Sequence, residues 1–204
     1  MFGIHHRVKN NLQVISGLLN LQSHYIDDEA VRTLYKESQN RIKTMALIHE
    51  ELYQRDDLAR INLAEYIKGL AGNLMSSYSV ATDRVELALD LEDADIALDT
   101  AIPCGLIVNE IVSNSLTHAF PDGRPGTIQI GLRCVSPVQY ELVMQDDGIG
   151  LPADLDMKET QTLGLRLVSI LAEQLSGDLQ VDREQGLRFR LTFEEYLEAG
   201  TEMY

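Results

Sequence analysis

Residues 101–120 read AIPCGLIVNEIVSNSLTHAF, a long apolar stretch that predicts a buried helix beginning near Ala101–Pro103 and continuing through Phe120. Proline suits the first turn of a helix, because the backbone N–H groups there have no partner inside the helix. Four residues with an amide, carboxylate or imidazole side chain interrupt the apolar run: Asn109, Glu110, Asn114 and His118. Glu110, Asn114 and His118 follow one another at intervals of four, so an α-helix places them on one face.

The segments around this helix predict a sheet. From Val85 to Leu91, apolar residues alternate with polar or small ones, which is typical of a half-buried strand. Asn62 and Glu65 have the spacing of a capping box, so another helix is expected to follow Asn62. The remaining predicted elements are strands at 127–133 and 140–145, a helix from about 163 to 175, and a terminal hairpin of strands 179–182 and 187–193. We therefore expect the α+β class, a sandwich of one mixed sheet with helices on one face.

The N-terminal part is predicted to be helical. Apolar residues recur every three or four positions from Val8 to Leu21 and again from Val31 to Leu52, with a polar, acidic turn between them. Two long helices joined by a short turn form an antiparallel hairpin. A hairpin alone buries too little apolar surface, so we expect two copies to form a dimeric four-helix bundle. The alternative is a hairpin that packs on its own domain. The expected domains are residues 1–57 and 58–204.

The composition excludes several classes of protein. A formal net charge of −15 over 204 residues argues against nucleic-acid binding and against an anionic membrane surface, because both partners attract basic proteins. No apolar run approaches the roughly 18 residues of a membrane-spanning helix, so we expect neither membrane insertion nor a signal peptide. Cys104 and Cys134 lie in apolar segments without metal-ligand spacing, which is typical of reduced thiols in a cytoplasmic protein.

Two adjacent histidines, His5 and His6, stand near the start of the first predicted helix. A neutral imidazole has a pKa near ~6.5, keeps a free lone pair at pH 7 and can act as a nucleophile. The alternative is a pair of solvated histidines at a helix end. A chain that begins at such a helix is expected to be a fragment of a longer protein.

Three further groups of residues are suited to nucleotide binding. Glu110 and Asn114 offer the hard oxygen ligands that Mg²⁺ prefers, although polar residues on the outer face of a helix are also ordinary. Residues 146–150, DDGIG, directly follow a predicted strand; glycine lets the backbone approach a ligand, and Asp146 can accept a hydrogen bond from an exocyclic amine. The alternatives are a hairpin turn or a calcium loop, and the latter lacks the further oxygen ligands it needs. Gly164 opens a helix whose first N–H groups can receive phosphate oxygens.

In this order the three groups resemble the N, G1 and G2 boxes of the ATP-binding domain shared by histidine kinases, gyrase, Hsp90 and MutL, the GHKL superfamily with its Bergerat-type fold. Residues 5–13, HHRVKNNLQ, resemble the phosphoacceptor box of the second class of histidine kinases, which is related to the HWE kinases. Residues 39–53 and 101–110 fit the same class. The resemblance covers nearly the whole chain.

The resemblance implies roles for the helical residues. His6 looks like the phosphoacceptor, because it directly precedes the Arg-Val-Lys-Asn run, and His5 is its rival. Asn114 resembles the Mg²⁺-binding asparagine, and Glu110 either binds Mg²⁺ or polarises a water or the nucleophile. Asn109 lies beside them as a further nucleotide-binding candidate.

The resemblance also implies an adenine pocket. Asp146 is similar to the acid that accepts a hydrogen bond from the adenine amine. The other nucleotide-binding candidates are Gly148 and Gly150, which shape that pocket, Gly164 and Leu165 after a short ATP lid at 151–162, and His118.

The chain departs from the family pattern in three places, one of which is a G2 box reduced to the single glycine Gly164. Relatives often carry Asn-Ala-x-Lys at the N box, whereas this chain reads Asn-Ser-Leu-Thr from Asn114, so Thr117 replaces a lysine that could neutralise phosphate. His118, Arg124 and Arg166 are the candidates to compensate. Arg7 follows the phosphoacceptor where the larger kinase class has an acid, so the catalytic base is not identified.

The function implied is that of a two-component sensor histidine kinase core. It phosphorylates itself on histidine with ATP and Mg²⁺, and passes the phosphoryl group to an aspartate in the receiver domain of a response regulator. The implied partners are that regulator, a second copy bound through the hairpin, and an upstream sensor domain absent from this chain. The main alternative is a non-catalytic histidine phosphotransfer or scaffold protein with a degenerate ATP domain. A serine kinase of the GHKL type that acts on an anti-sigma partner ranks last, because the histidine-bearing hairpin has no purpose in it.

Overall fold

The computed structural model describes residues 2–28, 31–32, 35, 38–39, 41–42, 60–78, 84–150, 163–184 and 186–195. For residues 2–9 and 163 the description covers the backbone alone. The chain divides into two compact units, Met1–Ala59 and Arg60–Tyr204. Within the described ranges, none of the helices combines the length and apolar character needed to cross a membrane.

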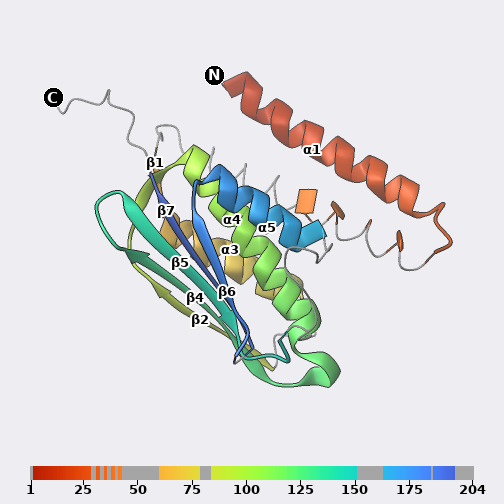
Figure 1. Cartoon of the computed structure of the whole chain (residues 1–204). Helices are drawn as coiled ribbons and strands as arrows, with labels where there is room; N and C mark the ends of the chain where they lie inside the picture. The colour runs from red at the N-terminus through yellow and green to blue at the C-terminus, as the bar shows by residue number, and fades with distance from the viewer. Residues whose placement is uncertain are drawn as a thin grey trace. The chain divides into compact units, whose positions relative to one another are not determined.

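The first unit contains the helix α1 (Phe2–Ser23), drawn in red in Figure 1. It begins earlier than the apolar pattern from Val8 predicts. The side-chain hydroxyl of Ser23 donates to the Asn20 carbonyl at 2.8 Å, and His24 and Tyr25 form a turn there. The described residues between 31 and 42 are helical, as predicted, while 43–52 of the second predicted helix lie outside the described residues.

The second unit is built on a mixed five-stranded sheet in the order β2–β4–β5–β7–β6. β2 and β4 run parallel, and the other neighbouring pairs are antiparallel. Three helices cover one face of the sheet (Figure 1), which confirms the predicted α+β fold. The strands are β2 (Val85–Leu91), β4 (Gly126–Cys134), β5 (Gln139–Asp146), β6 (Asp178–Asp182) and β7 (Leu187–Glu194), and the helices are α3 (Leu63–Ser77), α4 (Leu98–Asn114) and α5 (Leu163–Gln174).

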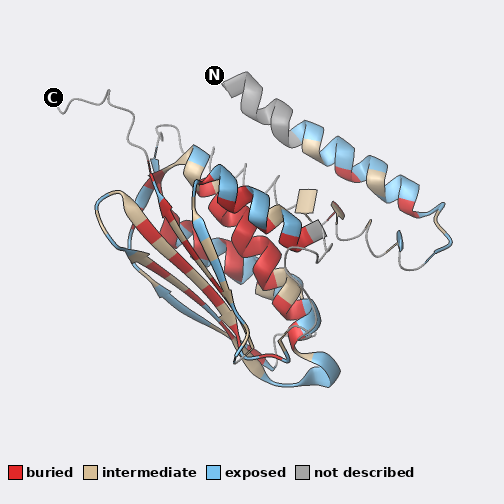
Figure 2. Ribbon diagram, in the orientation of Figure 1, coloured by how far each residue is buried: buried red, intermediate tan, exposed pale blue. Residues whose placement is uncertain are grey.

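The hydrophobic core lies between the sheet and these helices. Along β5 and β7 every second side chain is buried, which produces the alternating colours of the strands in Figure 2. The rings of Tyr140 and Phe193 stack with their centroids 5.6 Å apart. Complete burial of a large apolar side chain contributes about 1.5–3 kcal/mol. The largest side chains buried to this degree are Phe189, Phe193, Leu63, Ile67, Ile96, Ile107, Ile128, Ile130, Leu132, Leu142 and Met144.

Two short strands were not predicted. β1 (Arg60–Asn62) and β3 (Asp95–Ala97) pair in an antiparallel arrangement beside the main sheet. Three residues are too few for an alternating pattern to be recognised. The buried carboxylate of Glu195 accepts hydrogen bonds from the Ala97 N–H at 2.5 Å and from the Arg60 guanidinium at 2.6 Å, so it ties this small sheet to the chain just after β7.

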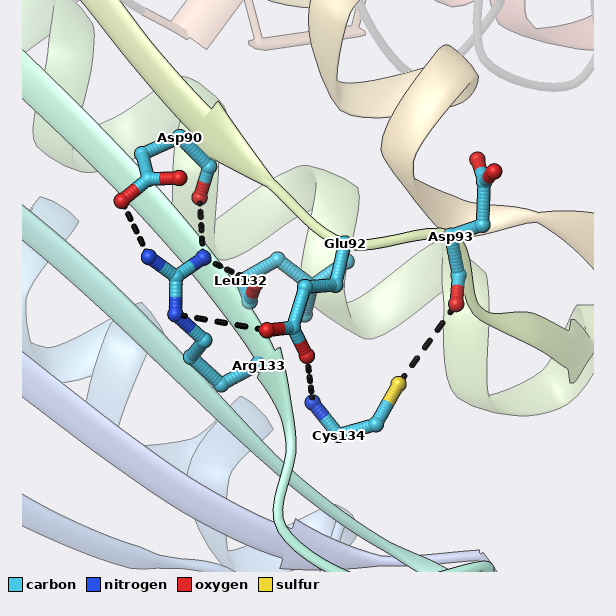
Figure 3. Close-up of polar contacts among 6 residues, drawn as sticks. All are labelled: Asp90, Glu92, Asp93, Leu132, Arg133 and Cys134. Atoms are coloured by element: carbon cyan, nitrogen blue, oxygen red, sulfur yellow. Dashed lines mark hydrogen bonds and ion pairs between the residues drawn. The ribbon is translucent and has the colours of Figure 1, made fainter.

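Polar side chains connect the end of the edge strand β2 to β4 (Figure 3). Arg133 forms ion pairs with Asp90 and with Glu92, and the hydrogen bond to Asp90 is the main reason why the pKa of the guanidinium is raised. The second carboxylate oxygen of Glu92 accepts from the Cys134 N–H at 2.9 Å. The Cys134 thiol donates to the Asp93 carbonyl at 3.5 Å. Side chains therefore reinforce the backbone hydrogen bonds between β2 and β4. In the described part of the chain, β4 is the only strand that pairs with β2.

The central helix differs from the prediction at both ends. α4 begins at Leu98, earlier than expected, and its α-helical part ends at Asn114. A π-helical turn, η1 (Ser115–Ala119), and a short 3₁₀ turn, η2 (Pro121–Gly123), follow it. The predicted continuous α-helix through Phe120 is therefore wrong. Pro121 disfavours the α conformation at the residue before it, and Phe120 has φ −124° and ψ 61°.

Candidate functional site

The site is built around Asp146, the last residue of β5, whose side chain is only 3% exposed. One carboxylate oxygen, Oδ1, accepts from the Gly148 N–H at 3.0 Å. The other, Oδ2, accepts from the Ser115 hydroxyl at 2.7 Å. A buried carboxylate is costly unless donors surround it, and these two contacts provide them. Asp146 therefore presents a hydrogen-bond acceptor at the end of β5.

Three positions in the loop after Asp146 and in the neighbouring turn between β6 and β7 require glycine, because of close packing or a positive φ. A Cβ on Gly148 would lie 2.4 Å from the Ala119 Cβ and 2.5 Å from the Ala119 carbonyl oxygen. Gly150 has φ +68°, a conformation that other residues rarely adopt. Gly186 has φ +85°, and a Cβ there would meet the Asp146 carbonyl oxygen at 2.0 Å.

The neighbouring Asp147 has a different task. It is exposed, and its Oδ1 accepts from the Thr127 N–H at 2.7 Å. Its backbone carbonyl accepts from the Arg124 guanidinium at 3.0 Å. Asp147 thus fastens the loop to the start of β4, and Arg124, a candidate to compensate for the missing lysine, contacts the loop backbone.

The polar residues of α4 lie at different depths. Asn109 and Glu110 are buried, and the Asn109 amide donates to the Glu110 carboxylate at 3.4 Å. Asn114 is half-buried at the last α-helical position, one turn after Glu110, as the spacing predicts. His118 is exposed within the π-helical turn, which changes the helical phase between Asn114 and His118.

Thr117, which replaces the lysine of the family pattern, is exposed and bonds locally. Its hydroxyl donates to the Ser113 carbonyl at 2.7 Å, one turn earlier. This bond uses the hydroxyl proton within the helix itself.

The start of α5 supplies backbone donors. Gly164 and Leu165 are buried in its first turn, where N–H groups lack partners inside the helix. Arg166 follows and is exposed. The predicted lid, residues 151–162, lies outside the described residues.

The predicted phosphoacceptor and its rival, His6 and His5, lie in the first two turns of α1. Their side chains lie outside the described residues.

Sequence reasoning missed Ser115, Ala119 and Gly186, which surround Asp146 and its loop. Ser115 carried one signal, since the family pattern has alanine at this position. Ala119 accepts a hydrogen bond from the Ile149 N–H at 3.0 Å through its carbonyl, a contact that no side-chain pattern predicts. Gly186 reads as an ordinary turn residue between two strands.

The residues present fit a magnesium ion that is shared with a phosphate ligand. No group of three or more His, Cys, Asp or Glu side chains able to hold a metal occurs among the residues that the structure describes. Mg²⁺ does not need such a group, because it commonly takes one or two protein oxygens and completes its shell with phosphate oxygens and water. Glu110 and Asn114 offer that number of oxygen donors, one turn apart.

Comparison with known families agrees with this geometry. Residues 3–78 match the family described as "Histidine kinase". Residues 100–197 match the family described as "Histidine kinase-, DNA gyrase B-, and HSP90-like ATPase". The second match includes α4, the Asp146 loop and α5, so the site lies within a known type of ATPase domain.

Individual histidine kinases match most of the chain. Sensor histidine kinase PdtaS of Mycobacterium tuberculosis (strain CDC 1551 / Oshkosh) is 33% identical over 189 residues, which cover 90% of this chain and 37% of that protein. Blue-light-activated histidine kinase 2 of Erythrobacter litoralis (strain HTCC2594) is 27% identical over 182 residues, which cover 88% of this chain and 52% of that protein. The chain therefore spans about a third to a half of the length of these relatives.

A solved structure has the same fold. The histidine kinase domain of the blue-light activated histidine kinase of Erythrobacter litoralis EL346 matches with a TM-score of 0.70, over 91% of this chain and 94% of that one, at 22% identity. With a histidine kinase segment followed by an ATPase domain, this chain belongs to the histidine kinase family.

Proposed function

We propose that this chain is the catalytic core of a two-component sensor histidine kinase, which transfers the γ-phosphoryl group of ATP to His6 and then to an aspartate of a response regulator. The observation that carries the proposal is the buried Asp146 carboxylate beside a loop whose positions 148 and 150 suit glycine alone, within an ATPase domain. A residue that accepts hydrogen bonds at this depth suits the exocyclic amine of adenine. We assign residues 1–57 to dimerisation and phosphotransfer, and 58–204 to ATP binding.

The nucleotide is expected to contact three elements. Asp146 accepts from the adenine amine, and Gly148 and Gly150 let the base approach the loop. The first turn of α5, with Gly164 and Leu165, offers backbone N–H groups and the positive end of the helix dipole to the phosphates. Asn109 and His118 complete the proposed nucleotide contacts.

Asn114 and Glu110 are the proposed protein ligands of Mg²⁺. When bound, the ion supplies charge neutralisation for the phosphate oxygens. Glu110 has a second candidate role, in which it polarises a water or the imidazole. Its burial beside the Asn109 amide keeps its side chain in place for either role.

Phosphoryl transfer requires positioning and charge neutralisation more than covalent chemistry by the protein. A ring nitrogen lone pair of His6 forms a bond to the γ-phosphorus, and the bond between that phosphorus and the bridging oxygen breaks, which releases ADP. The proton on the attacked imidazole is lost to a base that is not identified. In the second step a carboxylate oxygen of the regulator forms a bond to this phosphorus, and the bond between the phosphorus and the ring nitrogen breaks. The ring takes up a proton from solvent, which regenerates the neutral imidazole.

The surface of α1 supports a homodimer. Leu12 and Leu19 are half-buried and Ser16 and Ser23 are buried on one side of the helix. A second group of apolar residues is 46–62% exposed on another side, and consists of Val14, Ile15, Leu18 and Leu21. A helix in a four-helix bundle needs two such sides, one for its hairpin partner and one for the second copy. We propose a cytoplasmic core that receives its signal from a sensor domain elsewhere in a longer protein.

The test is incubation of the chain with γ-labelled ATP and Mg²⁺. We expect label on the protein that is lost in acid, because phosphohistidine is acid-labile and phosphoserine is not, and that passes to an added receiver domain. Asp146→Asn should abolish labelling and ADP binding. The absence of both labelling and nucleotide binding, the latter measured by calorimetry with and without Mg²⁺, would contradict the proposal and indicate the non-catalytic phosphotransfer alternative.

A further inference from the structure

We propose that Ser115 is a positioning residue, which fixes the Asp146 carboxylate and thereby makes the site select 6-aminopurine over 6-oxopurine nucleotides. The inference rests on the proposed nucleotide binding. It assigns a role to a residue that stands where the family pattern has alanine.

The hydrogen bond between Ser115 and Asp146 is short and buried. Ser115 and Asp146 are 4% and 3% exposed, and the Ser115 hydroxyl donates to Asp146 Oδ2 at 2.7 Å. Hydrogen bonds to ionised acceptors in a buried setting are stronger than neutral ones. This bond joins η1, the turn directly after α4, to β5 through side chains that lie 31 residues apart in the sequence.

Two donors hold the carboxylate in one orientation. The Gly148 N–H reaches Oδ1 at 3.0 Å while the Ser115 hydroxyl reaches Oδ2. With one donor on each oxygen, rotation of the carboxylate breaks at least one bond. Each oxygen keeps a further lone pair for a ligand.

The π-helical turn lies against the end of β5 and the loop that follows it. The turn begins at Ser115 and ends at Ala119, and its first residue contacts β5 while its last contacts the loop. Ser115 bonds to Asp146, and the Ala119 carbonyl accepts from the Ile149 N–H at 3.0 Å. Single π-helical turns often occur at functional sites.

Carboxylate orientation matters for the choice of base. A 6-aminopurine presents an amine donor at C6, which a fixed carboxylate accepts. A 6-oxopurine presents a carbonyl oxygen there, which a carboxylate repels, and a donor at the adjacent ring nitrogen instead. A carboxylate that is free to rotate can reach that second donor, so loss of Ser115 should weaken discrimination and not only affinity.

The experiment compares ADP with inosine diphosphate, which differ in the group at C6 and in the proton on the adjacent ring nitrogen, by calorimetry on the full chain. We expect the wild type to prefer ADP. Ser115→Ala should weaken ADP binding about tenfold and change inosine diphosphate binding little, so that the Kd for inosine diphosphate divided by the Kd for ADP falls. Ser115→Thr keeps the hydroxyl and should keep the ratio. Ser113→Ala is the matched control, because the Ser113 hydroxyl bonds only locally, to the Glu110 carbonyl at 3.2 Å, among the contacts described.

Ser115→Cys provides the same test if the alanine variant does not fold. It keeps the shape of serine with a weak donor, and should also lower the ratio. If the variants bind both nucleotides more weakly to the same extent, the bond between Ser115 and Asp146 only supports the fold. If they bind ADP more tightly, Ser115 competes with the nucleotide. Either result overturns the inference, whereas a wild-type chain that binds no ADP overturns the proposed function itself.

Discussion

Asp146 and Asp147 are adjacent residues of the same type with different environments. Asp146 lies inside the fold, where Ser115 and Gly148 donate to it. Asp147 lies outside and accepts from the Thr127 backbone. The alternation of a strand, which sends successive side chains to opposite faces, separates the two roles. Nucleotide binding should therefore depend on the carboxylate of Asp146 and loop attachment on that of Asp147.

Gly148→Ala tests how closely the loop packs against the π-helical turn. The new Cβ would meet Ala119 at 2.4 Å, so the loop or the turn must shift. We expect a loss of about 1–3 kcal/mol in the free energy of unfolding, the usual range for overpacking, together with weaker ADP binding. Denaturant unfolding and calorimetry measure both. Gly131→Ala is the control, since its Cβ would have ordinary contacts, the nearest at 3.7 Å. A Gly148→Ala chain with the stability and ADP affinity of the wild type would disprove the tight packing.

His6→Gln tests the phosphoacceptor. It should abolish labelling from γ-labelled ATP and leave the ADP affinity unchanged, because residues 1–57 are not the proposed nucleotide domain. His5→Gln should retain labelling, and His24→Gln, in the exposed turn after α1, is a control outside the motif. Labelled His6→Gln protein would refute this assignment and favour His5.

At the scale of elements, α1 and α4 differ in what their apolar residues do. α4 is surrounded by protein over most of its length, and its buried polar residues, Asn109 and Glu110, are consequently held in place. α1 leaves apolar side chains exposed on one side. Exposed apolar groups that cluster on a helix indicate a further interface.

Leu18→Glu tests that interface. Leu18 is 55% exposed, so a charge there costs little in a monomer and much in an apolar dimer interface. We expect sedimentation to show a monomer, or a dimer with a Kd raised at least about tenfold. Gln13→Glu adds the same charge at an exposed polar position and should stay dimeric. A Leu18→Glu chain that dimerises like wild type would remove the support that α1 gives to the bundle.

At the scale of the whole molecule, the sheet and three helices act as one support for the site. β5 carries Asp146, α4 carries Asn114, and the turn between β6 and β7 brings Gly186 against the Asp146 backbone. The buried core beneath them also contains Cys104, and burial raises the pKa of its thiol well above the ordinary value.

That thiol predicts how stability depends on pH. The unfolded chain ionises Cys104 near pH 8.5, whereas the folded chain keeps it protonated, so the folded state binds more protons above that pH. The free energy of unfolding should therefore be unaffected by this group below about pH 8 and fall as the pH rises from about 8.5. Urea unfolding at pH 7 to 9.5 measures the slope. Cys104→Ala should make the slope shallower, and a slope that this substitution leaves unchanged would contradict the assignment.

Much of the fold follows from local patterns. Alternation predicted the strands around Val85–Leu91 and 140–145 within a residue or so, and Asn62 caps α3 as expected, since its side chain accepts from the Glu65 N–H at 3.0 Å. The patterns also singled out Asn114, Asp146 and Gly148, because polar or glycine residues at unusual positions are visible without a structure.

The sequence by itself determined the α+β class, the helical N-terminal segment, and the resemblance to histidine kinases. It could do so because hydrophobic periodicity and motif spacing are local properties of the chain. Only the tertiary structure decided the strand order, the π-helical turn after Asn114, and the meeting of Ser115 and Gly186 with Asp146. Those features depend on contacts between residues far apart in sequence, and no local pattern encodes which distant surfaces will meet.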